Sequence, residues 1–119
     1  MDGEITPEAL ADLLEAPGAD PTVVDIRDRR AFARGHLPGS ENLPLGELTG
    51  EIDTVAGADH VVTVCPHGEA SVQAARLVAA YEGFEGVVES LAGGLEAWEG
   101  PLETAAEDPG VGQDPEAPF

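Results

Sequence analysis

The chain contains one cysteine, Cys65, and the residues around it are the first with the means to do chemistry. Four residues suited to a buried strand, 61–64, lead directly into Cys65, and a helical pattern begins near Ser71. Pro66 and Gly68 lie in the short connection, where both residue types favour a tight turn. Because ligands of open α/β sheets bind beyond the carboxyl ends of the strands, this position predicts a binding site at Cys65.

A loop of this length would direct several backbone N–H groups toward the cysteine sulfur. Together with the N-terminus of the following helix, these groups carry partial positive charge, which favours a thiolate and lowers the cysteine pKa below the free value of about 8.5. The same groups would hold the oxygens of a small anion. The alternative is a buried structural cysteine, where most free cysteines are found, and the spacing alone favours neither interpretation.

The segments around this loop alternate between strand and helix patterns. Strand patterns cover 22–26, 61–64 and 86–91, and a brief extended piece lies near Asn42-Leu43. Helical patterns are expected after Thr6-Pro7, over 27–35, in broken form over 45–57, from Ser71 to Tyr81 and within 92–98. The expected apolar face of the 71–81 helix consists of Ala74, Leu77, Val78 and Tyr81. This alternation predicts an α/β fold, in which helices cover both faces of a parallel sheet.

The chain length suits one domain with one core, since there are 119 residues and a mass of 12.2 kDa. We expect residues 1–102 to form this domain. Residues 103–119 are rich in proline, glycine and acidic residues and lack periodicity, so we expect them to form a disordered tail.

The charge of the chain is strongly negative, with 24 acidic residues against five arginines, no lysine and a net charge of −19. This charge fits a well-solvated surface, an acidic partner for a basic protein, or adaptation to a cytoplasm with molar salt. We favour the third interpretation, because the acids are spread along the whole chain and salt near 1 M shortens the Debye length to ~3 Å. Five scattered arginines cannot build a basic patch, which argues against nucleic-acid binding.

The composition also indicates a cellular compartment. No apolar run approaches the length that spans a membrane, and residues 1–10 lack the basic and apolar regions of a signal peptide. A single cysteine cannot form an internal disulfide. Together these features predict a cytoplasmic protein that does not bind membranes and keeps its thiol reduced.

Three stretches of the chain resemble the motifs of the rhodanese-like family. The stretch 23–44 resembles the first signature of these domains, with Asp-x-Arg, an aromatic residue, Gly-His-x-Pro-Gly and Asn-x-Pro. The stretch 61–71 resembles their active-site loop, and 93–98 resembles their closing Gly-Gly-x-x-x-Trp motif. The resemblance implies a parallel α/β sheet of about five strands. It also implies a sulfurtransferase, in which a cysteine takes a sulfane sulfur, holds it as a persulfide and passes it to a nucleophile.

The resemblance also implies roles for single residues. Cys65 would be the nucleophile, and the residues that would bind the substrate are Pro66, His67, Gly68, Glu69, Ala70 and Ser71. Three residues would support this loop from further away: Asp25, Arg27 and His36. For Arg27 we favour charged hydrogen bonds between elements, and for His36 we favour orientation of a turn over acid–base catalysis. Four further motif residues would serve turns and packing: Asn42, Gly93, Gly94 and Trp98.

No cofactor and no metal are expected, because Cys65 and His67 lack a second close pair of ligands. The implied partners are a small sulfur donor, either thiosulfate or a persulfide, and a thiol or cyanide acceptor. A sulfur-relay protein is a further possible partner.

The loop departs from the family pattern at its end. Many members carry an arginine there, whereas this chain has Glu69-Ala70-Ser71. A carboxylate in this place repels thiosulfate. The missing arginine also argues against the activities of the related phosphatases and arsenate reductases, whose loops are longer by one residue and end in arginine. Two alternatives to a sulfurtransferase therefore stay open: a non-catalytic interaction module with the same fold, and a redox sensor whose thiol is simply oxidised.

Overall fold

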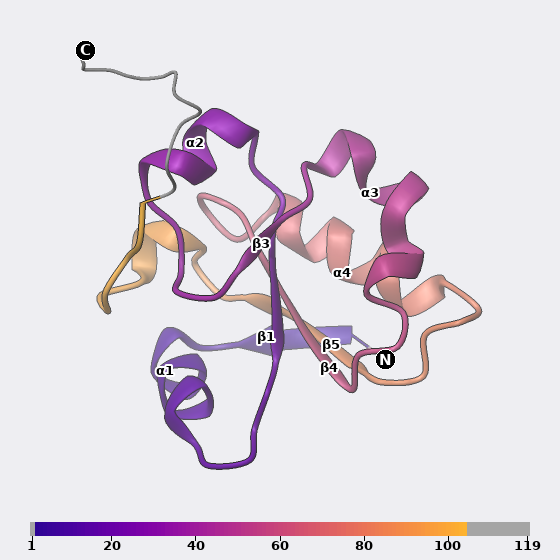
Figure 1. Cartoon of the computed structure of the whole chain (residues 1–119), viewed down its shortest axis with the longest axis horizontal. Helices are drawn as coiled ribbons and strands as arrows, with labels where there is room; N and C mark the ends of the chain where they lie inside the picture. The colour runs from indigo at the N-terminus through magenta and orange to yellow at the C-terminus, as the bar shows by residue number, and fades with distance from the viewer. Residues whose placement is uncertain (1, 105–119) are drawn as a thin grey trace.

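The computed structural model describes residues 2–104, which contain a parallel sheet between two layers of helices. Its five strands are β1 (Asp2–Ile5), β2 (Thr22–Asp25), β3 (Glu41–Asn42), β4 (His60–Val64) and β5 (Val87–Leu91). The strand order is β1-β5-β4-β2-β3, and every neighbouring pair is parallel (Figure 1). The predicted α/β fold with a five-stranded parallel sheet is therefore confirmed.

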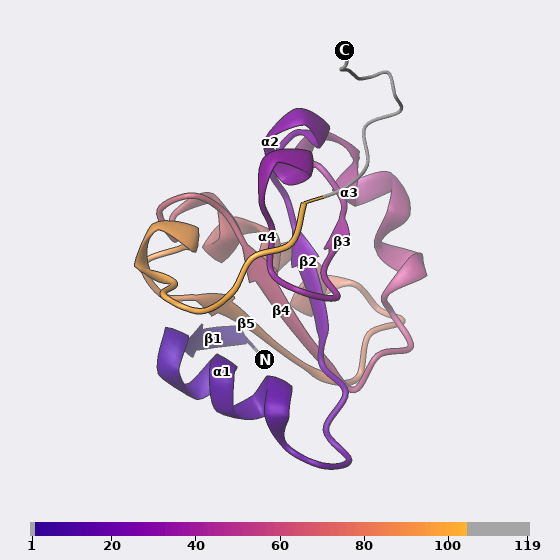
Figure 2. The ribbon, with the colours of Figure 1, turned by 60° about the vertical axis from the view of Figure 1, so that its left-hand side comes forward.

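The helices divide between the two faces of this sheet. They are α1 (Pro7–Glu15), α2 (Arg29–Arg34), α3 (Leu45–Glu51) with the 3₁₀ turn η1 (Ile52–Thr54), α4 (Ala70–Ala80) and the 3₁₀ turn η2 (Leu95–Ala97). Figure 2 shows α1 on one side of the strands and α3 and α4 on the other. Each side buries its own apolar cluster, and the central strands β2 and β4 contribute valines to both. Strands that are apolar on both faces are typical of a covered parallel sheet.

Local signals determine where the first two helices begin and where α2 ends. The Thr6 hydroxyl accepts the Ala9 N–H at 3.1 Å before α1, and the Asp28 carboxylate accepts the Ala31 N–H at 2.8 Å before α2. These side chains satisfy N–H groups that have no partner inside the helix. Gly35 follows the last residue of α2, as the sequence predicts.

The strand β1 is the element that the sequence patterns did not indicate. It pairs with β5 at the edge of the sheet, with Ile5 opposite Leu91. Gly3 and Glu4 are exposed and Ile5 is buried, so the strand carries too short an apolar pattern to be recognised. Its position depends on the partner strand β5, which lies far along the chain.

The expected apolar face of α4 is correct at Ala74, Leu77 and Val78 but wrong at Tyr81. Ala74 and Val78 are fully buried, and Leu77 packs against the same cluster. Tyr81 is 37% exposed. The helix ends at Ala80 and Tyr81 has an extended backbone, so its side chain leaves the face that helical spacing assigns to it.

The described chain passes the predicted domain boundary at residue 102. Glu103 forms an isolated antiparallel bridge with His36, whose backbone N–H and C=O exchange bonds of 2.9 and 2.8 Å with it. Leu102 also packs near Gly35. Most of the predicted tail, residues 105–119, lies outside the described residues. Within residues 2–104, no helix is long and apolar enough to cross a membrane.

Candidate active site

The cysteine loop lies at the carboxyl edge of the sheet, as the sequence predicts. Cys65 follows the last residue of β4, and α4 begins at Ala70 after the connecting turn. The Ile26 N–H donates to the Val64 carbonyl at 3.0 Å, and the Leu95 N–H donates to the Cys65 carbonyl at 2.8 Å. The backbone at Val64 and Cys65 is therefore held by the residue that follows β2 and by the 3₁₀ turn after β5. Cys65 itself is only 2% exposed.

Hydrogen bonds around the sulfur favour its ionised form. The Gly68 N–H donates to Cys65 Sγ at 3.0 Å, and Ser71 Oγ lies 3.3 Å from the same sulfur. Burial by itself raises the pKa of the Cys65 thiol. The hydroxyl of Ser71 and the backbone N–H groups of Ser71, Gly68 and His67 oppose burial and together lower that pKa below its ordinary value.

The cysteine loop lies directly against the two glycines that follow β5, Gly93 and Gly94. Gly68 has a φ of +87°, and a Cβ there would lie 2.8 Å from the Gly93 nitrogen. Gly94 has a φ of +69°, and a Cβ there would lie 2.5 Å from the nitrogens of His67 and Gly68. The two backbones touch where no side chain fits, so the Gly-Gly motif shapes the cysteine loop directly. The Glu96 N–H adds a bond to the Pro66 carbonyl at 3.0 Å.

The other predicted substrate-binding residues occupy different depths. Pro66, His67 and Glu69 are exposed, and Ala70 is half-buried. His67 Nδ1 lies 3.2 Å from the Glu96 carboxylate, so its ring leans toward the turn after β5. Ser71 is fully buried, which places it beneath the sulfur rather than at the mouth of the loop.

Asp25 and Arg27 connect the end of β2 to its neighbours rather than contacting the sulfur. The Arg27 guanidinium donates to both carboxylate oxygens of Asp25 at 2.7 to 3.1 Å and to the Gly35 carbonyl at 2.6 Å. The Asn42 amide donates to the carbonyls of both residues, at 3.0 and 2.9 Å. Asp25 is 1% exposed, so this pair is a buried clamp on the turn that leads into α2.

His36 is also a packing residue in this structure. Its ring stacks on Phe32 with 3.8 Å between ring centroids and 8° between planes, and Nδ1 lies 2.7 Å from the Phe32 carbonyl. Its backbone pairs with Glu103. The ring therefore holds the end of α2 in place.

Two buried hydroxyls near the site were not predicted. Ser90 Oγ lies 2.6 Å from Ser71 Oγ, and the Thr63 hydroxyl donates to the Ser71 carbonyl at 2.7 Å. Both side chains are fully buried. The signal that could have revealed them is a polar residue inside an apolar strand, which stands out in Val61-Val62-Thr63-Val64 and in Val87-Val88-Glu89-Ser90-Leu91.

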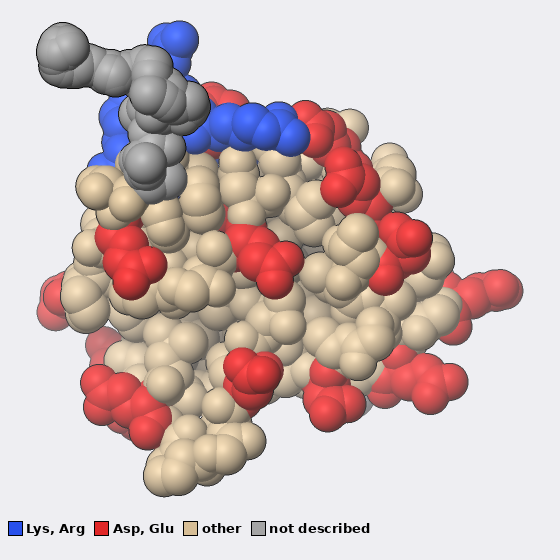
Figure 3. Space-filling view, viewed as in Figure 1, with Lys and Arg blue, Asp and Glu red and all other residues tan. Residues whose placement is uncertain are grey.

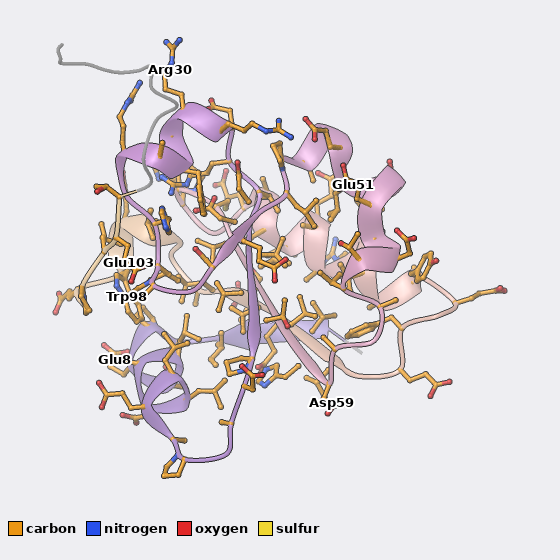
Figure 4. The ribbon with its side chains drawn as sticks, viewed as in Figure 1. Glu8, Arg30, Glu51, Asp59, Trp98 and Glu103 are labelled. Carbon is orange, nitrogen blue, oxygen red and sulfur yellow. The ribbon has the colours of Figure 1, made fainter. Side chains whose placement is uncertain are left out.

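The arginines are clustered, so the expectation that five scattered arginines build no basic patch starts from a wrong premise. Four of the five arginines fall within residues 27–34. Figure 3 shows positive side chains gathered at the end of the molecule that carries α2, with acidic side chains over the rest of this face. In Figure 4, Arg30 lies at this end, and Glu8 and Asp59 lie toward the opposite end. The Arg29 guanidinium meets the Glu47 carboxylate at 2.7 and 2.8 Å, which lowers the pKa of Glu47.

Other hollows of the molecule lie away from the sulfur. One of about 460 Å³ is lined by Leu13 and by residues 18–22 and 57–60, which lead into β2 and β4 and include their first residues, so it lies at the amino edge of the sheet. Among the residues that the structure describes, no group of three His, Cys, Asp or Glu side chains could hold a metal ion.

Comparisons with known proteins identify relatives of the whole domain. The family model described as "Rhodanese-like domain" matches residues 6–101. A protein of Pseudomonas putida strain GB-1, named thiosulfate sulfurtransferase GlpE, is 39% identical over 106 residues, which cover 85% of this chain and 90% of the relative. A Pseudomonas aeruginosa protein of the same name is 41% identical over 97 residues, or 79% of this chain and 81% of the relative.

Solved structures agree with these sequence relatives. The solution structure of the rhodanese-like domain of an Anabaena protein is 30% identical and covers 96% of this chain and 89% of that one, with a TM-score of 0.75. The crystal structure of a thiosulfate sulfurtransferase from Pseudomonas aeruginosa is 27% identical, also with a TM-score of 0.75. It matches 88% of this chain and 20% of the longer protein. On the match over residues 6–101 and on these relatives, the chain belongs to the rhodanese-like domain family.

Proposed function

We propose that this chain is a sulfurtransferase that carries a sulfane sulfur on Cys65 as a persulfide. The observation that carries this proposal is the surrounding of the sulfur, where the Gly68 N–H and the Ser71 hydroxyl lie 3.0 and 3.3 Å from Sγ. Both groups stabilise negative charge, and they lower the pKa of the thiol that has to attack. The names of the GlpE relatives support the same reaction class.

The proposed reaction transfers one sulfur atom in two steps, with Cys65 as the carrier. The Cys65 thiolate attacks the outer sulfur of the donor, the sulfur–sulfur bond of the donor breaks, and its electron pair leaves with sulfite when the donor is thiosulfate. A nucleophilic acceptor such as cyanide then attacks the outer sulfur of the persulfide. Thiocyanate leaves, and the Cys65 thiolate is restored without any net oxidation of the protein.

The burial of Cys65 restricts the shape of the donor. Because the residue is 2% exposed, the donor must present its sulfur as a slender terminal group. The outer sulfur of thiosulfate and the terminal sulfur of a persulfide both meet this condition. Thiosulfate is the donor that the names of the relatives support, and Glu69 at the loop surface is the group that opposes a dianion.

Mass spectrometry of the intact protein tests the proposal. After incubation with thiosulfate in high salt, we expect a gain of one sulfur atom, and we expect none in Cys65→Ser. A persulfide and a sulfinic acid add nearly the same mass, so cyanide is then added. Cyanide should restore the original mass and release thiocyanate if the adduct is a persulfide.

The outcomes separate the three candidate functions. A mass gain that cyanide does not remove would indicate a redox sensor. No gain from thiosulfate or from a low-molecular-weight persulfide, in a protein shown to be folded, would favour a non-catalytic interaction module.

A further inference from the structure

A chain of buried hydroxyls leads from the cysteine sulfur into the sheet. Ser71 Oγ lies 3.3 Å from Cys65 Sγ, and Ser90 Oγ lies 2.6 Å from Ser71 Oγ. Ser71 and Ser90 are both fully buried, and Cys65 is 2% exposed. The three side chains come from three elements: the loop after β4, the first turn of α4, and β5.

The direction of the hydrogen bonds between these three side chains must reverse when the thiol ionises. A neutral thiol can donate its proton to Ser71 Oγ, and the Ser71 hydroxyl can then donate to Ser90. A thiolate has no proton to give, so the single proton of Ser71 must turn toward the sulfur. Ser71 Oγ then has to accept a hydrogen bond, and Ser90 is the hydroxyl placed to donate it.

Ser90 is costly at its position unless it makes this bond. It lies on β5 two residues after Val88, on the same face of the strand, and Val88 belongs to the apolar cluster that also contains Cys65 and Ala74. A buried hydroxyl without a partner is destabilising, and its partner here is Ser71. A small apolar residue would pack as well but could not donate.

We propose that Ser90 is a positioning residue, which turns the Ser71 hydroxyl toward the Cys65 sulfur when that sulfur is a thiolate. Among the described residues, the sulfur is hydrogen-bonded to Ser71 and Ser90 is hydrogen-bonded to Ser71, so Ser90 acts through Ser71. The inference rests on the proposed function only in taking Cys65 as the reacting group. It concerns the free protein and requires no sulfur donor.

The test is a pH titration of the Cys65 thiolate by its ultraviolet absorbance. Since the chain has one cysteine, each variant is measured against the same variant carrying Cys65→Ser. Ser90→Ala removes the bond to Ser71 in both protonation states, but the loss costs the thiolate more, because a bond to Ser71 strengthens the one that Ser71 donates to the charged sulfur. We therefore expect the midpoint to rise, with a thiolate fraction below the midpoint that is about 2- to 5-fold lower. Ser90→Thr keeps the hydroxyl and should restore the midpoint.

Val88→Ala is the matched control, because it removes buried atoms from the same face of β5 without removing a hydroxyl. Its midpoint should stay at the parent value although its stability falls. Thermal unfolding of every variant establishes that it is folded before the titration.

The Ser71→Ala background gives the decisive comparison. If Ser90 acts through Ser71, adding Ser90→Ala to Ser71→Ala should cause no further rise of the midpoint. An unchanged midpoint in folded Ser90→Ala, or an equal rise in both backgrounds, would overturn the inference. A protein that shows the expected shifts but gains no sulfur from donors would retain this inference and refute the proposed function.

Discussion

At the scale of single residues, a small number of hydrogen-bond donors determines the ionisation of the Cys65 sulfur. Gly68 contributes a backbone N–H and Ser71 a hydroxyl, and together with neighbouring N–H groups they outweigh the burial that would keep the thiol neutral. Asp25, Arg27 and His36 do not take part, since their hydrogen bonds go to the turn around α2. The residues that bond to the sulfur are thus different from the residues that hold the turn around α2.

The lowered pKa of Cys65 predicts how stability depends on pH. In the unfolded chain the thiol titrates near its free value of about 8.5, and the folded pKa is lower. The added stability is therefore fully present above the unfolded pKa and is lost as the pH falls through the folded pKa. Urea unfolding of the parent and of Cys65→Ala, from about pH 6 to about pH 10, should show a free-energy difference that grows in favour of the parent with pH. A constant difference would contradict the shift.

Glu69 should weaken the use of small dianionic donors. The residue is exposed, so water screens its repulsion of thiosulfate and limits the effect. We expect Glu69→Asn to lower the KM for thiosulfate by about two- to fivefold at low salt, and by less at high salt. Steady-state sulfur transfer to cyanide measures this change, with Cys65 still required. Equal KM values at every salt concentration would show that the carboxylate points away from the donor.

At the scale of elements, the loop after β4 takes its shape from the turn after β5. The contact consists of backbone atoms, because Gly68 meets Gly93 and Gly94 where a Cβ has no room. The bonds from Leu95 and Glu96 to the Cys65 and Pro66 carbonyls fasten the same two segments. The cysteine loop is therefore a product of two segments far apart in the sequence.

Gly94→Ala should damage the site, and Gly39→Ala is its matched control. Both glycines have positive φ, +69° and +78°, so both substitutions carry backbone strain. Only at Gly94 would the new Cβ meet other atoms, at 2.5 Å from the nitrogens of His67 and Gly68, whereas the space around Gly39 is open. We expect Gly94→Ala to lower Tm more and to raise the thiolate midpoint of Cys65. Equal effects of the two substitutions on Tm and on the midpoint would contradict this reading of the loop.

Truncation distinguishes the bridge at Glu103 from the residues beyond it. Deletion of 105–119 should leave stability and sulfur transfer unchanged, as expected from the composition of the tail. Deletion of 103–119 also removes the two backbone bonds to His36, each worth about 0.5 to 1.5 kcal/mol. Tm should then fall by several degrees, which thermal unfolding measures. An identical Tm for the two truncated proteins would show that the bridge adds nothing.

At the scale of the whole molecule, charge separates into two unequal parts. Positive side chains concentrate at the α2 end, and negative ones are dispersed over the rest of the face seen in Figure 3. The net charge of −19 on 119 residues creates strong self-repulsion in dilute buffer. The adaptation to molar salt remains a prediction of this charge.

Salt should therefore stabilise the fold. Between about 0.01 M and 1 M salt, the Debye length falls from ~30 Å to ~3 Å, so repulsion between distant carboxylates disappears. We expect Tm to rise steadily with KCl, as followed by circular dichroism. Potassium sulfate at equal ionic strength is a useful control, because a much larger rise in sulfate would point to salting-out of apolar surface instead. Unchanged stability across the KCl series would refute the halophilic interpretation.

The sequence alone determined those features that depend on neighbouring residues. The strand before Cys65, the helix start at Thr6-Pro7 and the end of α2 at Gly35 are local signals, and each appears where expected. The cap at Asp28 is a local signal of the same kind that the sequence patterns did not single out. The parallel sheet followed from the alternation of strands and helices, because the long crossover that parallel strands require is usually a helix. The position of Cys65 at a strand end was therefore predictable without the tertiary structure.

Only the tertiary structure decided which distant residues meet. Three such features join segments that are far apart in the sequence, and no local pattern predicts them. They are the bond between Ser71 and Ser90, the contact of Gly68 with Gly94, and the pairing of β1 with β5. A serine in a buried strand looks like a weak strand residue until its partner is known. Whether Cys65 is an inert core thiol or an ionised one depends on those partners, since burial and hydrogen bonding shift its pKa in opposite directions.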